Sequence, residues 1–478
     1  MNPRRGFPVS FYTLGCKLNQ LETEALAGAF REAGFPVLPW DDSERSALFI
    51  VNTCTVTSMA EQKARRIIRS FLRAARVVLV TGCYAELGGD ELAALGGELF
   101  VVPGRAKDAL LDLPSFLARS SGSGDPRGVS GLLRVWLEER RLLSFSLSLP
   151  GAATSSLPGP LPQGHPFRFA PRMFTFHSRA FVKIQDGCDR ACAYCRVPLA
   201  RGKSVSLAAA EVLARIKALE KQGAAEAVLT GVNISQYRDP ADPHRDLPGL
   251  LRILLDSTGS IALRLSSIDP GPELFENSPG DFLEVLSHRR IRNHFHLSVQ
   301  SGSDRILSAM GRSYLARDIL KAAEKLRSLR EDPFLACDII AGFPGESAGD
   351  FDKTAALCGT IGFAWIHGFP YSRRPGTRAA AMGEEPGRRI AGERVRILED
   401  MARRGRRAYA GRWLGKTLDA VAETGGGGPF FSALGANYLR IRVLSGGKRP
   451  KPGAGFRCRV TGEESAQGFD LRGELCVE

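Results

Sequence analysis

The stretch RAFVKIQDGCDRACAYCRVP, residues 179–198, joins a β-strand pattern to three closely spaced cysteines. Its first half is typical of a buried strand, and Cys188, Cys192 and Cys195 follow in a C-x3-C-x2-C pattern. A structural zinc site normally takes four protein ligands in two spaced pairs, and the nearest other cysteine is more than 100 residues away. Three thiolates can instead hold a [4Fe–4S] cluster and leave one iron open to a substrate or cofactor. Three structural cysteines in a loop are the alternative.

Five more strand patterns follow, separated by helical patterns. They are EAVLTGV (226–232), ALRLSSI (262–268), HFHLSVQ (294–300), ACDIIAGF (336–343) and FAWIHGFPY (363–371). Alternating strands and helices predict an α/β fold, here a partial or complete βα barrel over residues 178–410. Barrel enzymes place their chemistry at the carboxyl ends of the strands, and the cysteine loop follows the first strand.

Three further regions flank the predicted barrel. Residues 8–118 alternate short β-rich runs with helical patterns, which predicts a parallel α/β domain. Residues 119–177 are rich in Ser, Gly and Pro and are typical of a linker, with one helical pattern at LLRVWLEERRLL (132–143). Residues 411–478 contain the strand patterns TLDAVAE, YLRIRVL and GFRCRVTG, which favour a small β-barrel.

The composition of the chain indicates its class of protein, its location and its kind of partner. The chain has 478 residues, 44% of them apolar, and no apolar run long enough to span a membrane. The start lacks a secretory leader pattern and the ten cysteines are too sparse for a disulfide scaffold, so we expect a cytoplasmic protein. A formal charge of +14 suits a polyanionic partner such as nucleic acid, although basicity can also serve solubility alone.

Three more cysteines each follow a predicted strand of the first domain. Cys16, Cys54 and Cys83 stand in YTLGCKLNQ, IVNTCTVTS and LVTGCYAE. The carboxyl ends of parallel strands meet at one edge of a sheet, so these side chains can converge. A single cysteine in such a place is more often a buried core residue, but three in the same local context favour a shared site.

The two cysteine sets together resemble the methylthiotransferase family of the radical S-adenosylmethionine (SAM) superfamily. The resemblance covers nearly the whole chain outside residues 119–177, through LTGVNI (229–234), RLSSIDP (264–270), HLSVQSGSDRILSAMGRSY (296–314), DIIAGFPGE (338–346) and FPYSRRPGTRAA (369–380). It implies that Cys188, Cys192 and Cys195 hold a catalytic [4Fe–4S] cluster whose open iron is chelated by SAM. It also implies that Cys16, Cys54 and Cys83 hold an auxiliary [4Fe–4S] cluster that delivers sulfur. Two SAM molecules would be consumed per turnover, one as radical source and one as methyl donor.

Candidate SAM contacts lie at predicted strand ends. Gly231 and Gly302 allow a backbone to approach a ligand closely, and Asn233 and Gln300 can donate and accept hydrogen bonds. Tyr194 stands before the third cysteine, where the family has an aromatic residue. An ordinary turn or strand end explains a single Gly or Asn equally well.

The motifs GCKLNQLETE, VLTGVNI and SRRPGT resemble most the branch of the family that acts on tRNA threonylcarbamoyladenosine. That branch replaces the C2 hydrogen of N6-threonylcarbamoyladenosine, at tRNA position 37, by a methylthio group. The alternatives are a sister branch acting on isopentenyl-adenosine or a ribosomal protein aspartate, or a non-catalytic iron–sulfur protein that binds RNA. The reaction also implies a reducing electron donor and a sulfur donor.

The carboxyl-terminal part carries the candidate RNA contacts. Twelve arginines and five acidic residues lie between Arg373 and Arg412. The β-rich segment that follows resembles the TRAM domain, an oligonucleotide-binding small barrel of this family, which implies contact with the tRNA anticodon stem-loop. Tyr438 or Phe431 is a candidate to stack on a base. A solvated helix face is the alternative reading of the basic run.

The chain departs from the family pattern near the cysteine loop. Ala191 replaces an aromatic residue, Arg196 an apolar residue, Leu199 a tyrosine and Val205 an arginine. None of these departures removes a cysteine.

Overall fold

The computed structural model describes residues 6–40, 46–74, 76–120, 128–142, 165–171, 174, 176, 178–277, 282–424, 428–447, 449–464 and 468–476. Most of the predicted linker, including residues 143–164, lies outside these ranges. The chain divides into two compact units. The first unit comprises residues 1–176, 186–189 and 195–203, and the second comprises residues 177–185, 190–194 and 204–478.

A five-stranded parallel sheet forms the centre of the first unit, in the order β2-β1-β3-β4-β5. Its strands are β1 (Val9–Thr13), β2 (Val37–Leu38), β3 (Leu48–Thr53), β4 (Val77–Gly82) and β5 (Leu99–Val101). All six residues of β3 are buried, as expected of a parallel strand covered on both faces. The parallel α/β prediction for this part is confirmed.

Helices lie between and after these strands in the sequence. They are α1 (Lys17–Glu32), α2 (Ser58–Arg73), α3 (Cys83–Leu87), α4 (Gly89–Ala93), η2 (Gly104–Leu111), α5 (Leu113–Ser120) and α6 (Gly128–Glu139), and the short α8 (Val197–Arg201) also belongs to this unit. Thr57 caps α2 by accepting a hydrogen bond from the backbone N–H of Ala60 at 3.1 Å. The helix α6 lies where the sequence predicts one within residues 119–177.

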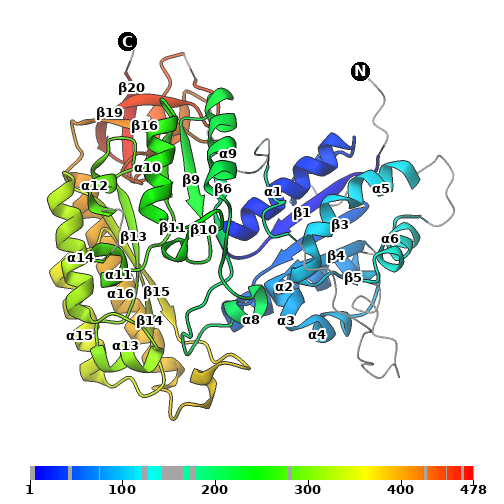
Figure 1. Ribbon diagram of the computed structural model, residues 1–478, viewed down its shortest axis with the longest axis horizontal. Coiled ribbons are helices and arrows are strands. Elements are labelled where there is room, and N and C mark those ends of the chain that lie inside the picture. The colour runs from blue at the N-terminus through cyan, green and yellow to red at the C-terminus, as the bar shows by residue number, and fades with distance from the viewer. Residues whose placement is uncertain are drawn as a thin grey trace. The chain divides into compact units, whose positions relative to one another are not determined.

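Six parallel strands form the centre of the second unit (Figure 1). They are β6 (Ala180–Lys183), β9 (Glu226–Thr230), β12 (Ala262–Leu265), β13 (His294–Gln300), β14 (Phe334–Ala341) and β15 (Trp365–Pro370). The strands pair in the orders β12-β9-β6 and β13-β14-β15, and isolated parallel bridges at Leu263–Ile291 and Ile268–Leu297 link the two sets. All six predicted strands are confirmed. The described residues show no pairing of β6 with β15, so the barrel is partial.

Helices and short elements complete this region. They are α9 (Ala209–Lys221), α10 (Leu247–Ser257), α11 (Pro272–Phe275), α12 (Phe282–Ser287), α13 (Asp304–Met310), α14 (Ala316–Leu329), α15 (Ala348–Ile361), α16 (Gly387–Gly411), η3 (Ile234–Gln236), η4 (Arg378–Ala381), β7 (Gln185–Asp186), β8 (Val205–Ser206), β10 (Arg238–Asp239) and β11 (Asp242–Asp246). Figure 1 shows α14 and α15 along the outer side of the sheet that contains β13, β14 and β15. No helix in the described ranges is long and apolar enough to cross a membrane.

The carboxyl-terminal strands close into a small barrel in the order β16-β17-β18-β20-β19. They are β16 (Thr417–Ala422), β17 (Phe430–Gly435), β18 (Arg440–Leu444), β19 (Gly455–Glu463) and β20 (Leu471–Leu475). The prediction of a small β-barrel is confirmed, although the sequence indicated only three of these five strands. The barrel shares its core with Phe334, Ala336 and Tyr409 from β14 and α16.

Candidate functional site

Cys16, Cys54 and Cys83 each stand just beyond the carboxyl end of a strand of the first sheet. Cys16 precedes α1, Cys54 follows β3 directly, and Cys83 is the first residue of α3 directly after β4. The strands β1, β3 and β4 are neighbours in the sheet. The sheet order therefore brings three residues that are far apart in the sequence to one edge, as the sequence analysis predicts.

The three thiols lie close enough to influence one another. A Cβ atom added at Gly15, next to Cys16, would lie 2.8 Å from Cys54 Sγ. Burial, and then the proximity of Cys16 and Cys83, raise the pKa of Cys54 to about 12. Without a metal this thiol is therefore protonated at neutral pH, and metal binding would have to displace its proton. The backbone N–H of Val56 already points to Cys54 Sγ at 3.5 Å.

A glycine with positive φ precedes three of the six candidate cysteines. Gly15 has φ 104°, Gly82 has φ 100° and Gly187 has φ 68°. A Cβ at Gly82 would lie 2.4 Å from Thr53 O, and one at Gly187 would lie 1.9 Å from Lys203 O. The chain conformation that presents each cysteine thus excludes any side chain at the preceding residue. The dipeptide Gly-Cys is the sequence signal for this feature, which was not among the predictions from sequence.

Replacing Gly187 by alanine is expected to prevent the C-x3-C-x2-C loop from holding the iron–sulfur cluster that the sequence predicts for it. The new Cβ would collide with the Lys203 carbonyl, so the loop must move, and we expect the protein to lose about half of its bound iron. Gly223 is the matched control, because it has φ 83° but no atom within 4 Å of an added Cβ. Gly223→Ala should cost about 1–3 kcal/mol of stability and keep its iron. Iron analysis and visible absorbance after anaerobic reconstitution measure the cluster content of both variants. Equal iron in the two variants would contradict the prediction.

The cysteines of the C-x3-C-x2-C loop are all partly exposed, and none of them forms a disulfide. In the first unit, Cys188 N–H donates to Gly202 O at 3.1 Å, and Cys195 Sγ accepts from Val197 N–H at 3.4 Å. In the second unit, Cys192 Sγ accepts a hydrogen bond from Arg312 Nη1 at 3.2 Å. N–H groups directed at sulfur are the contacts that stabilise and tune cysteine-ligated iron–sulfur clusters.

The donor set fits iron–sulfur clusters better than a single metal ion. Among the described residues, no three His, Cys, Asp or Glu side chains are close enough to hold one metal ion. In a [4Fe–4S] cluster each cysteine binds a different iron, so its ligands stand further apart than those of one ion. Six cysteines in two sets of three, with N–H donors aimed at the sulfurs of Cys54, Cys192 and Cys195, have the chemistry that such clusters require.

Arg201 lies beside the first cysteine set, with its side chain only 6% exposed. Its guanidinium donates to Asn19 Oδ1 at 2.9 Å, Glu22 Oε1 at 3.0 Å and Asp186 Oδ1 at 3.1 Å. Burial alone lowers the pKa of Arg201, but Cys83, Glu22 and Asp186 more than offset it, so the pKa lies well above its ordinary value. A permanent positive charge therefore stands near these thiols. The sequence gives no local signal for this position of Arg201, because all but one of its partners lie about 180 positions earlier.

Arg196, a departure from the family pattern, also has a defined place. It donates to Thr55 Oγ1 and Glu61 Oε1, both at 3.3 Å, and Thr55 Oγ1 donates to Glu61 at 2.5 Å. Thr55 directly follows Cys54. These hydrogen bonds therefore hold the segment after Cys195 against the residues that follow Cys54.

Two candidate SAM contacts, Gly231 and Asn233, surround the side chain of Gln185. A Cβ at Gly231 would lie 2.8 Å from Gln185 Oε1, and the N–H of Asn233 donates to the same oxygen at 2.9 Å. Asn233 Oδ1 accepts from the N–H of Ser235 at 3.2 Å and caps η3. Packing against Gln185 accounts for the glycine, and a SAM contact at either residue stays a prediction.

The other candidate SAM contacts occupy different parts of the second unit. Gln300 ends β13 with φ 67°, a conformation unusual for any residue except glycine. Gly302 packs against α15, where an added Cβ would lie 2.7 Å from Thr354 Cα, so its lack of a side chain has a packing cause. Tyr194 packs against a buried apolar cluster that includes Ala193 and Met310.

The proposed base-stacking role of Phe431 is wrong. Phe431 is 1% exposed and packs on Phe456 inside the small barrel, because its position on β17 faces the core. Tyr438 is partly buried, and its ring stacks on His294 with centroids 3.9 Å apart, with the Arg264 guanidinium 5.2 Å from the ring. Intramolecular contacts therefore occupy both aromatic rings.

Several arginines of the basic run also have partners within the protein. Arg394 is buried and pairs with Glu346, Arg406 binds Asp470 at 2.5 Å, and Arg412 binds Asp332 at 2.7 Å. These ion pairs attach α16 to neighbouring elements. The charge count therefore overstates how many arginines can contact phosphate.

Two family models match the chain. The model described as Radical SAM superfamily matches residues 182–358, and the one described as Uncharacterized protein family UPF0004 matches residues 8–104. Threonylcarbamoyladenosine tRNA methylthiotransferase MtaB of Treponema pallidum is 42% identical, over 96% of this chain and 99% of the relative. The protein of the same name from Aquifex aeolicus is 32% identical, over 86% and 92%. A tRNA-2-methylthio-N(6)-dimethylallyladenosine synthase of Cereibacter sphaeroides is 30% identical, over 95% and 97%.

Proposed function

Because the chain belongs to the radical SAM methylthiotransferase family, we propose that it methylthiolates C2 of N6-threonylcarbamoyladenosine at position 37 of tRNA. The observation that carries this proposal is the pair of cysteine triads, one of which is gathered at the edge of the first sheet. The 42% identity to a relative named for that nucleoside, over nearly the full length of both chains, supports the substrate.

Family membership implies a [4Fe–4S] cluster and SAM. We propose that Cys188, Cys192 and Cys195 hold this cluster, that Cys16, Cys54 and Cys83 hold a second one, and that two SAM molecules are used per turnover. When bound, these groups supply the electron, the hydrogen-abstracting radical, the sulfur and the methyl group that the exchange of C2–H for C2–SCH3 requires. A reducing electron donor and a sulfur donor complete the set of partners.

The protein's own residues position these groups. The glycines before Cys16, Cys83 and Cys188 set the chain conformation that presents the thiols. Arg201 places a buried positive charge beside the first triad, which favours thiolates over thiols there. Tyr194, Gly231, Asn233, Gln300 and Gly302 are the proposed SAM contacts.

We propose that the four parts of the chain have separate roles. Residues 8–118 would hold the auxiliary cluster, residues 119–177 would act as a linker, residues 178–410 would carry the radical chemistry, and residues 411–478 would contact the tRNA anticodon stem-loop. The net charge of +14 supports an RNA partner, and binding should weaken steeply as salt rises. A tRNA substrate also places the enzyme in the cytoplasm.

The nucleosides of a deletion strain test the substrate. We expect 2-methylthio-N6-threonylcarbamoyladenosine to disappear from its tRNA while the unmethylthiolated nucleoside accumulates, as measured by liquid chromatography and mass spectrometry. A plasmid copy should restore the product and a Cys54→Ala copy should not. Loss of the methylthio isopentenyl nucleoside instead would assign the chain to the sister branch, and an unchanged tRNA profile would favour a protein target.

A further inference from the structure

Arg312 is a charged side chain that directly contacts a thiol of the C-x3-C-x2-C loop. Its Nη1 donates to Cys192 Sγ at 3.2 Å, and its side chain is only 8% exposed. The residue follows Gly311, which ends α13 with φ 75°. A Cβ at Gly311 would lie 3.0 Å from Ala191 O, and Ala193 N–H donates to Met310 O at 2.8 Å. The end of α13 thus packs directly against the loop around Cys192.

Several buried groups fix the guanidinium of Arg312. Its Nε donates to Tyr314 Oη at 2.7 Å, and its Nη2 donates to Ser298 O at 3.4 Å. Tyr314 Oη in turn donates to the same carbonyl. With Nε and Nη2 both held in this way, Nη1 is directed at the sulfur. Arg312 is therefore oriented before any cofactor binds.

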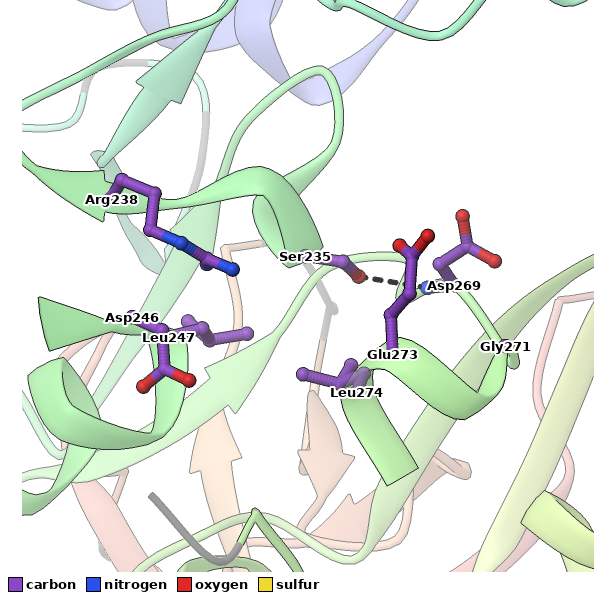
Figure 2. A pocket seen from close by; sticks show the side chains of 8 residues that line it. All are labelled: Ser235, Arg238, Asp246, Leu247, Asp269, Gly271, Glu273 and Leu274. Carbon is purple, nitrogen blue, oxygen red and sulfur yellow. Dashed lines mark hydrogen bonds between the residues drawn. The ribbon is translucent and has the colours of Figure 1, made fainter. Parts of the chain in front are cut away.

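Asp269 supplies the opposite charge. Its carboxylate lies 3.5 Å from Arg312 Nη2 and 3.4 Å from Arg190 Nη2, and the residue is 4% exposed. Asp269 lines a small cavity of about 40 Å³. Ser235 Oγ accepts a hydrogen bond from the Asp269 backbone N–H at 2.9 Å, and Figure 2 marks this bond with a dashed line. Neither carboxylate oxygen makes a hydrogen bond within the described residues. Attraction to the two arginines is therefore the main interaction that offsets the cost of burying this charge. One buried carboxylate thus sits between two guanidiniums, and one of those reaches Cys192.

We propose that Arg312 is a positioning residue that raises the reduction potential of the cluster held by Cys192, and that the charge of Asp269 moderates this effect. Reduction adds negative charge to a cluster and its thiolates. A nearby guanidinium that also donates a hydrogen bond to a ligand sulfur stabilises the reduced form, and the low dielectric of a buried site strengthens the effect. The inference needs only the cluster that the family implies, and not the identity of the substrate.

The test measures the reduction potential of this cluster alone, without SAM. A parent variant with Cys16, Cys54 and Cys83 all changed to alanine removes the second triad, and redox titration followed by electron paramagnetic resonance gives the midpoint. We expect Arg312→Gln to lower the reduced-to-oxidised ratio at a fixed potential about tenfold, which is 59 mV for a one-electron couple. Asp269→Asn should shift the midpoint in the opposite direction, because it removes a negative charge from the same group.

Two further variants separate this role from simple structural damage. Arg330→Gln makes the same chemical change at an arginine whose guanidinium donates to the backbone carbonyls of Ser287, His288 and Ile291, and it should leave the midpoint unchanged. Arg312→Lys keeps the charge and loses the planar donor, so its midpoint should fall between those of the parent and Arg312→Gln.

The outcomes are distinct. Equal midpoints for Arg312→Gln and the parent, with weaker SAM binding, would make Arg312 a SAM contact and overturn the proposal. If Arg312→Gln holds too little iron to titrate, Asp269→Asn decides: a raised midpoint supports the proposal, and an unchanged or lowered one overturns it. A parent variant that binds no iron would instead refute the assignment of the cluster to the C-x3-C-x2-C loop.

Discussion

Changing Cys54 to alanine should abolish the methylthio product while SAM cleavage continues. Cys54 belongs to the triad at the edge of the first sheet, whereas the proposed SAM-binding cluster would be held by a separate set of cysteines. Removing one of three ligands should release the auxiliary cluster, so the iron content should fall from about eight to about four per chain. Iron analysis, 5′-deoxyadenosine formation and nucleoside mass spectrometry give the three readouts on one preparation.

Cys476→Ala is the matched control for this change. Cys476 follows β20, is partly exposed and lies outside both triads, so its loss should leave iron and product unchanged. If Cys54→Ala instead retains all of its iron and still forms product, the second triad holds no cluster. Loss of SAM cleavage together with the product would mean that the two triads do not act separately.

Changing Glu226 to glutamine should destabilise the second unit by about 3–5 kcal/mol, the usual cost of leaving a buried charge without its partner. The fully buried Glu226 carboxylate binds Arg264 Nε at 2.6 Å and Nη2 at 2.9 Å, and Arg292 Nε at 2.9 Å. Arg264 also donates to Gly435 O in the small barrel at 3.2 Å. The variant leaves two buried arginines without a counter-charge at the junction of β9, β12 and β17.

Hydrogen exchange of the β9 peptide measures this effect locally. A loss of about 3–5 kcal/mol corresponds to an increase of roughly a hundredfold to a few thousandfold in the exchange rate of globally protected amides. The exposed Glu284, which pairs with Arg252, is the control, and Glu284→Gln should cost less than about 1 kcal/mol. Equal exchange in the two variants would contradict the account of the buried network.

The same carboxylate predicts a pH dependence. Burial alone raises the pKa of Glu226, but Arg264 and Arg292 lower it to about 2, below its ordinary value of 4.5. Because the folded-state pKa is lower than the unfolded-state pKa, ionised Glu226 stabilises the fold at pH values above about 4.5. This stabilisation is lost as the pH falls from about 4.5 toward 2. The stability difference between the native protein and Glu226→Gln should therefore shrink over this range.

Local patterns were enough to predict the sheets and the two cysteine sets. Strand patterns such as HFHLSVQ carry their own signal in the alternation of apolar and polar residues, and β13 occupies the predicted residues 294–300. The convergence of Cys16, Cys54 and Cys83 follows from parallel topology, in which strand ends share one edge.

The charged networks could not be predicted in this way. Arg312 meets Cys192 across 120 positions, and Arg201 meets Asn19 across 182, so no local spacing records either contact. The error at Phe431 has a related cause. An aromatic residue in a short strand fits a binding surface and a barrel core equally well, and only barrel closure, through the undetected strands β17 and β20, decides which way it faces.

Turnover of a defined RNA with labelled SAM tests the central claim most directly. Reconstituted protein, a reductant, sulfide, methyl-deuterated SAM and an anticodon stem-loop that carries N6-threonylcarbamoyladenosine are incubated anaerobically, and the nucleosides are analysed by mass spectrometry. The account predicts a 2-methylthio nucleoside with a deuterated methyl group, with 5′-deoxyadenosine and S-adenosylhomocysteine formed alongside it. SAM cleavage with no methylthio group on this RNA, at an iron content of about eight per chain, would contradict it.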